Sequence, residues 1–201
     1  MRSRGGATAN ALSVLRLTLA IPFAVLMASE NPAAAPLAGL VLVVAVVTDL
    51  LDGPIARRSG TAGTRGQVLD HVSDVVFVAG GLAGVASRGA IPWLLPILVC
   101  LAFAQYVADS YWLRPARARG RGGLWESRLG RWNGILYFVP LAVDVLIRMD
   151  AGLPAGLLRP IAWALVATTA LSMVLRLARL RGPHGTARRT PFAGTPDRSG
   201  R

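Results

Sequence analysis

Residues 36–56 read PLAGLVLVVAVVTDLLDGPIA, an apolar run that carries no charge before Asp49. A helix needs roughly 20 mostly apolar residues to span the hydrocarbon core of a bilayer, and this run is long enough. We therefore expect residues 36–56 to form a transmembrane helix. Its unusual feature is that Asp49 and Asp52 lie near its end, because a lone carboxylate inside a membrane is unfavourable.

The rest of the chain repeats this apolar pattern. Hydrophobic residues make up 53% of the 201 residues and charged residues only 16%, whereas a typical globular domain has about 25% charged residues. The composition predicts an all-α, polytopic integral membrane protein and excludes a disordered chain or a disulfide scaffold. We expect six transmembrane helices, at residues 11–28, 36–56, 68–86, 91–113, 133–147 and 154–175.

The arginines predict the orientation of these helices. There is no lysine, and eighteen of the 22 arginines fall in residues 1–10, 57–67, 114–132 and 176–201. Arginine and lysine are enriched in cytoplasmic segments, so both termini are predicted to be cytoplasmic, in a bacterial plasma membrane. We expect residues 1–181 to form one six-helix membrane domain and residues 182–201 a disordered basic tail.

Four aspartates are the most distinctive feature of the sequence. Asp49 and Asp52 are three residues apart, and Asp70 and Asp74 are four apart, so each pair shares a helix face. The short segment between them predicts two antiparallel neighbouring helices with both pairs at one cytoplasmic depth. Four carboxylates this close need cations, and all-oxygen ligation favours Mg²⁺ or Mn²⁺, with two ions balancing the charge.

Two metal ions held by carboxylates indicate phosphoryl transfer, because paired ions stabilise the attacking and leaving oxygens. Gly53, Ala56 and Gly66 have little or no side chain, which lets a bulky ligand approach the backbone. Arg57 follows Gly53 by four residues and is placed to bind a phosphate. The alternative is that Asp49 and Asp52 are interfacial residues that pair with Arg57 and Arg58, which leaves the second aspartate pair and the glycines unexplained.

The window from Asp49 to Asp74 resembles the signature of the CDP-alcohol phosphotransferase family, D-x2-D-G-x2-A-R-x8-G-x3-D-x3-D, at every fixed position. Members of that family move a phosphatidyl or similar group from a CDP-linked lipid donor to the hydroxyl of a polar acceptor and release CMP. The resemblance implies a homodimer, with Asp74 as general base close to or on the second metal. It also implies metal ligation by Asp49, Asp52 and Asp70, and a CDP site bordered by Gly53, Ala56, Arg57 and Gly66.

A second resemblance lies on the first predicted helix. Asn10, Ser13, Arg16 and Pro22 are similar to the family's N-x2-T-x2-R-x5-P pattern, with serine in place of threonine. The first three residues fall near one helical stripe. They face the nucleotide or headgroup, or they are a helix cap and an arginine that extends to the interface, and both interpretations stay open.

The acceptor is less defined by the sequence, and glycerol 3-phosphate and inositol phosphate are the two candidates. Arg128 and Arg131, three residues apart before the fifth predicted helix, are candidate ligands for an acceptor phosphate, or else part of a loop attracted to anionic lipid. The family's glycerol-3-phosphate enzymes usually carry a Lys/Thr-rich segment here, which this chain lacks. Asp109 and Asp144 either line the acceptor cavity or satisfy a neighbouring helix.

The competing functions are of other classes. A divalent-cation transporter would also use intramembrane carboxylates, but near the middle of the membrane, whereas these four are predicted near one interface. A nucleic-acid partner is not expected, because no soluble domain carries the basic residues. His71, next to Asp70, points to another helix face and is interpreted as a structural or interfacial histidine.

Overall fold

The computed structural model describes residues 4–59, 64–112 and 134–181, with side chains described for residues 13–48, 71–108 and 134–178. Within these ranges the chain is helical, which confirms the predicted all-α class. The α-helices are α1 (Arg4–Ala28), α2 (Ala35–Ser59), α3 (Thr64–Ser87), α4 (Leu94–Trp112), α7 (Phe138–Arg148) and α8 (Leu158–Arg181). Two short 3-10 helices, η1 (Pro32–Ala34) and η2 (Ala155–Leu157), precede α2 and α8. The predicted tail at 182–201 lies outside the described residues.

Prolines explain where four of the helices begin. Pro36, Pro96, Pro140 and Pro160 each lie in the first turn of a helix, namely α2, α4, α7 and α8. Proline is tolerated there because a first-turn N–H has no partner within the helix. Other ends differ from the predicted spans: α1, α2 and α8 all extend into arginine-bearing segments, because arginine favours a helix without being apolar.

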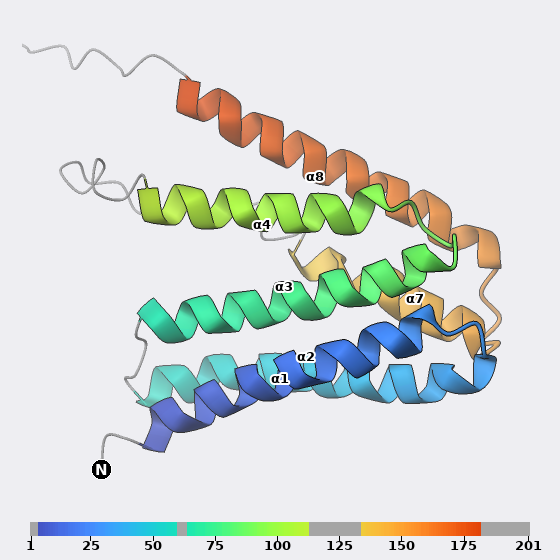
Figure 1. Cartoon of the computed structure of the whole chain (residues 1–201), viewed down its shortest axis with the longest axis horizontal. Helices are drawn as coiled ribbons and strands as arrows, with labels where there is room; N and C mark the ends of the chain where they lie inside the picture. Colours follow the sequence, from blue (N-terminus) through green and yellow to red (C-terminus); the bar gives the residue numbers. More distant parts are fainter. Residues whose placement is uncertain (1–3, 60–63, 113–133, 182–201) are drawn as a thin grey trace, which may run out of the picture.

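The helices form a bundle in which α3 and α7 lie between two outer pairs (Figure 1). On one side α1 and α2 pack together, and on the other side α4 packs against α8. The starts of α1 and α3 and the ends of α2, α4 and α8 lie together (Figure 1), and we call this end of the bundle the motif end, since α2 and α3 carry residues 49–74. The opposite end is called the far end.

The most extensive helix contact joins α1 to α3, which run in the same direction. The rings of Phe23 and Phe77 stack with centroids 4.4 Å apart. A Cβ added at Gly84 would lie 2.5 Å from the carbonyl oxygen of Ala24, and one at Gly80 would lie 3.5 Å from the Cβ of Ala24. Small residues four apart let helix backbones approach closely, so Gly80 and Gly84 set the distance between α1 and α3.

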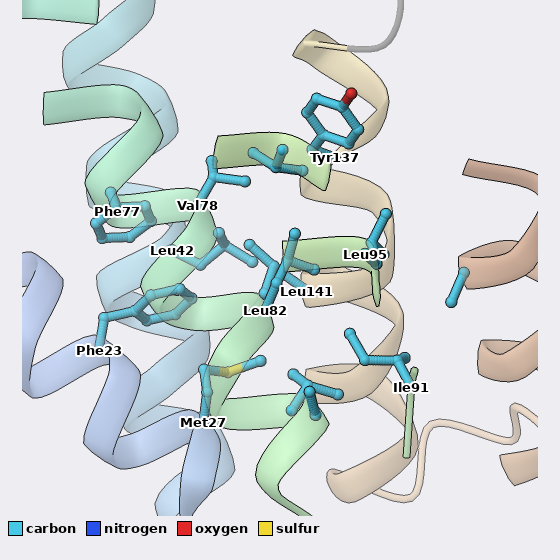
Figure 2. Packing of buried hydrophobic residues seen from close by; sticks show 14 of the residues in the cluster. Phe23, Met27, Leu42, Phe77, Val78, Leu82, Ile91, Leu95, Tyr137 and Leu141 are labelled. Carbon is cyan, nitrogen blue, oxygen red and sulfur yellow. The ribbon is translucent and has the colours of Figure 1, made fainter. Parts of the chain in front are cut away.

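An apolar core lies between the six α-helices described, and Figure 2 shows part of it. The largest fully buried apolar members are Phe23, Met27, Phe77, Leu82, Leu95 and Leu141. Among the described helices, one stretch is long and apolar enough to cross a membrane, at Ala155–Ala178. The apolar stretches of α1 to α4 are shorter, at Ser13–Ala28, Pro32–Thr48, His71–Ser87 and Leu94–Ala108.

Candidate active site

The backbone of α2 and α3 places both aspartate pairs near the motif end. Asp52 and Asp49 lie seven and ten residues before the end of α2, and Asp70 and Asp74 lie six and ten residues after the start of α3. At about 1.5 Å per residue, these positions are about 10 and 15 Å from the end of α2 and about 9 and 15 Å from the start of α3. Since only residues 60–63 separate the two helices, the two pairs are matched in depth.

Several predicted site residues fall where the structure gives no side-chain description. The side chains of Asp49, Asp52, Ala56, Arg57, Asp70 and Asp109 lie outside the described set, as do the surroundings of Gly53 and Gly66. Arg128 and Arg131 lie within residues 113–133, which are outside the described residues altogether. Their roles therefore stay predictions, and the side-chain geometry of the site centres on Asp74.

The carboxylate of Asp74 is bound by an arginine from another helix. Nη1 of Arg16 on α1 donates a hydrogen bond to Oδ1 of Asp74 on α3. The Arg16 side chain is 1% exposed, whereas that of Asp74 is 33% exposed. A buried guanidinium is unfavourable unless it is paired and hydrogen-bonded, so Asp74 stabilises Arg16 in the interior. The Asp74 side chain is thus held from inside the bundle and remains partly exposed.

The sequence shows Arg16 within the first predicted helix but does not identify Asp74 as its partner. A detectable signal was present, because an arginine within the apolar run 11–28 needs a carboxylate or another acceptor. The sequence offered several aspartates, and the choice among them depends on helix packing. Ser13, one turn before Arg16, is also buried, at 3% exposure.

A cation and two rings lie one turn from Asp74, toward the motif end of the bundle. The ring of His71 on α3 stacks on Tyr106 of α4, with centroids 5.8 Å apart and planes 10° from parallel. The guanidinium carbon of Arg176 on α8 lies 5.8 Å from the centroid of the same tyrosine ring. His71 is exposed and stacked, consistent with the interfacial role predicted for it. Arg176 was not among the predicted site residues.

Polar contacts continue along α8 from this group toward the middle of the bundle. The Tyr137 hydroxyl, just before α7, is 2.8 Å from the hydroxyl of Thr169, and both side chains are buried. Nε2 of Gln105 on α4 donates to the Met173 carbonyl at 3.4 Å. The inward face of α8 therefore changes from apolar near the far end to polar near the motif end.

Asp144, which the sequence places within the fifth predicted helix, lies at the far end. Nη2 of Arg88 donates to both of its oxygens, at 2.7 and 2.6 Å, and Nη1 of Arg148 lies 3.8 Å from Oδ2. The two guanidinium groups also donate to backbone carbonyls at and just after the end of α1, those of Leu26, Met27 and Asn31. Asp144 thus satisfies neighbouring helices, and we call Arg88, Asp144 and Arg148 the far-end cluster.

Comparison with known proteins identifies the family to which the chain belongs. Residues 7–175 match the family model described as CDP-alcohol phosphatidyltransferase. This chain belongs to the CDP-alcohol phosphatidyltransferase family. The match covers every described helix at least in part, and it includes the whole window from Asp49 to Asp74.

Curated relatives match over a smaller part of the chain. It is 30% identical over 101 residues to a probable phosphatidylglycerophosphate synthase of Mycobacterium tuberculosis, covering 49% of this chain and 48% of the relative. It is 27% identical over 131 residues to the CDP-diacylglycerol–glycerol-3-phosphate 3-phosphatidyltransferase 2 of Arabidopsis thaliana, covering 58% of this chain and 56% of the relative. The chain therefore spans about half the length of the curated relatives it matches. No solved structure matches it.

The residues at the motif end fit a divalent cation by two observations. The four signature aspartates lie at matched depths on α2 and α3, and the one whose side chain is described, Asp74, is partly exposed, at 33%. Oxygen donors of this kind are what Mg²⁺ and Mn²⁺ prefer. Within the described side chains, which omit Asp49, Asp52 and Asp70, no group of three or more His, Cys, Asp or Glu is close enough to hold a metal ion.

Proposed function

We propose that this protein transfers the phosphatidyl group of CDP-diacylglycerol to a hydroxyl group of glycerol 3-phosphate and releases CMP. The observation that carries the proposal is the complete family signature on α2 and α3, with its aspartates matched in depth at the motif end. The donor and acceptor come from the relatives, which are named as phosphatidylglycerophosphate synthases or glycerol-3-phosphate 3-phosphatidyltransferases.

In the proposed reaction Asp74 is the general base. Its exposed carboxylate takes the proton from the acceptor hydroxyl, whose oxygen then forms a bond to the lipid-side phosphorus. The bond between that phosphorus and the bridging oxygen of the pyrophosphate breaks, and CMP leaves with the electron pair. Arg57 binds the departing phosphate, and Gly53, Ala56 and Gly66 leave room for the cytidine nucleotide.

Asp49, Asp52 and Asp70, together with Asp74, would hold two divalent cations, Mg²⁺ or Mn²⁺. When bound, these ions would neutralise the pyrophosphate and the charge that develops on the attacking and leaving oxygens. The protein's own part is to hold the carboxylates on two rigid helices rather than on a loop.

We further propose that the bundle lies in the bacterial plasma membrane as a homodimer, with the motif end facing the cytoplasm. Large apolar side chains on the outer faces of α1 and α2 support the membrane placement, among them Ile21, Val25, Leu40 and Val43, which are 73%, 65%, 60% and 59% exposed. Soluble monomers rarely expose contiguous apolar surface on this scale. The arginine distribution along the sequence supports the orientation.

The acceptor phosphate needs a cation beside the aspartates. Arg128 and Arg131 stay the candidates from sequence, and Arg176 is a further one from structure, because it lies near the motif end over Tyr106, the ring that also stacks on His71. A cation-transport function has less support. Asp144, the buried carboxylate at the far end, is neutralised by two arginines and is not placed to pass an ion.

The proposal is tested with the purified full chain in lipid nanodiscs, supplied with CDP-diacylglycerol and Mg²⁺. CMP release is measured with glycerol 3-phosphate, inositol 1-phosphate, serine or phosphatidylglycerol as acceptor. We expect release with glycerol 3-phosphate above all others. Release with inositol 1-phosphate alone would keep the donor half of the proposal and replace the acceptor. A folded protein that releases no CMP with any acceptor would contradict the proposal as a whole.

A further inference from the structure

We propose that Arg16 is a positioning residue for the general base, holding the Asp74 carboxylate in the orientation that accepts the acceptor's proton. This inference rests on the proposed function. Arg16 lies outside the signature window, on a different helix, and is separated from Asp74 by 58 residues of sequence. Its contact is with the carboxylate itself, through Nη1 to Oδ1.

Arg16 and Asp74 are buried to unequal extents. Arg16 is among the largest fully buried side chains of the described residues, whereas the Asp74 side chain is 33% exposed. In the far-end cluster the order is reversed, because Asp144 is 4% exposed and Arg88 is 14% exposed. The far-end pair thus encloses its carboxylate within the bundle. The Arg16 pair instead supports the carboxylate from inside and leaves part of it accessible.

Helix α1, which carries Arg16, is anchored by contacts other than the one to Asp74. Further along α1, the Phe23 ring stacks on Phe77 and the Ala24 backbone lies against Gly84. At the end of α1, Nε of Arg88 donates to the Met27 carbonyl at 2.7 Å. These contacts fix the register of α1 along α3, so the guanidinium of Arg16 is held at a set height beside Asp74.

The chemical consequence concerns the direction of the carboxylate. Binding Oδ1 restricts rotation of the carboxylate, so its second oxygen also has a defined place. General-base catalysis depends on that geometry, and a misplacement of 1 Å can slow a reaction about a hundredfold. Removal of Arg16 should therefore slow the proton-transfer step and leave substrate binding largely unchanged.

The test compares Arg16→Met and Arg16→Lys with Arg88→Met and Arg88→Lys, a matched pair in the far-end cluster. CMP release is measured with CDP-diacylglycerol, glycerol 3-phosphate and Mg²⁺, per amount of folded protein. We expect Arg16→Met to lower kcat about a hundredfold, with both KM values within about threefold of wild type. Arg16→Lys keeps the charge but not the planar fork and should recover about tenfold of that loss. The Arg88 variants should lower thermal stability and keep kcat within about threefold.

Two further measurements separate positioning from a structural role. If Arg16 acts through Asp74, adding Arg16→Met to Asp74→Asn should not lower the residual turnover further, whereas an independent structural effect would add. Stabilisation of the protein by CDP in a thermal shift assay, which needs no turnover, should be the same in Arg16→Met as in wild type. If Arg16→Met is not recovered folded, Arg16→Lys and Arg16→Gln carry the same comparisons.

The possible failures are distinguishable. An Arg16→Met enzyme with normal kcat, or one whose loss adds fully to that of Asp74→Asn, overturns the positioning role while the wild-type activity still supports the proposed function. An equal loss of kcat in Arg16→Met and Arg88→Met also overturns it, because it marks a general effect of helix packing. A folded wild-type protein with no CMP release overturns both proposals.

Discussion

The two ends of the α1–α3 helix pair use the same chemical contact for different purposes. At the motif end the arginine is buried and its aspartate partner is open, whereas at the far end the aspartate is the more buried partner. The far-end arginines also bind backbone carbonyls at and just after the end of α1, which have no partner within the helix. The far end is therefore closed, and the motif end leaves a carboxylate exposed.

The two ends differ in which member of the ion pair is more exposed, and the more exposed member is the one able to contact a ligand. Burying both partners and satisfying them with backbone groups joins three helices, α1, α3 and α7, and leaves little capacity for a ligand. A partly exposed carboxylate that is paired with a buried arginine, as Asp74 is with Arg16, can still contact a ligand. Substitutions at either end of the bundle test this difference.

Replacing Asp74 with Asn should have the largest effect on activity. The amide cannot take the acceptor's proton, and a general base contributes about 10²–10⁴-fold to rate, so we expect CMP release to fall about a thousandfold. Stabilisation by CDP in a thermal shift assay serves as the control and should be retained. Turnover near the wild-type value would remove Asp74 from the mechanism.

Removing divalent cations with EDTA should abolish activity at the motif end and leave the far end unaffected. We expect CMP release to fall about a hundredfold or more and to return when Mg²⁺ or Mn²⁺ is added back in excess. The far-end cluster is held by arginine contacts to Asp144 and to backbone carbonyls, so circular dichroism should show the same helix content before and after chelation. Undiminished CMP release in metal-free buffer would argue against the metal role of the four aspartates.

Replacing Asp144 with Ala should have the opposite signature to the change at Asp74. It leaves Arg88 and Arg148 buried without their carboxylate, and breaking such a pair destabilises a protein by about 3–5 kcal/mol. We expect a clear fall in the thermal midpoint, measured in nanodiscs, with CMP release per folded molecule close to wild type. A loss of turnover without loss of stability would place Asp144 in the reaction after all.

Replacing Gly84 with Ala tests the close contact between α1 and α3 near the far end. The new Cβ would lie 2.5 Å from the Ala24 carbonyl oxygen and 2.9 Å from the Ala28 nitrogen, so α1 and α3 must separate. Overpacking of this kind costs about 1–3 kcal/mol, and the thermal midpoint should fall by a smaller amount than in Asp144→Ala. The matched control is Gly134→Ala, where a Cβ meets nothing within 4 Å. Equal midpoints in the two variants would contradict the close approach of α1 and α3.

Much of the helix layout was predictable because its signals are local. Apolar runs and first-turn prolines depend only on nearby residues, so every predicted span has a helical counterpart among the described residues. The ends were less accurate, and α1 starts at Arg4 rather than at residue 11, because a helix does not stop where the apolar run stops. The signature window was also visible, since its spacing lies within two adjacent helices.

The all-α class, the approximate helices and the family signature with Asp49, Asp52, Asp70 and Asp74 could be predicted from the sequence alone. Only the tertiary structure decided that Arg16 pairs with Asp74, and Arg88 with Asp144, across 58 and 56 residues of sequence. The physical reason is that a periodic pattern shows which face of a helix is polar but not which helix that face meets. The close approach of α1 to α3 at Gly80 and Gly84 brings Arg16 to Asp74, and the packing of α7 against α3 brings Asp144 to Arg88.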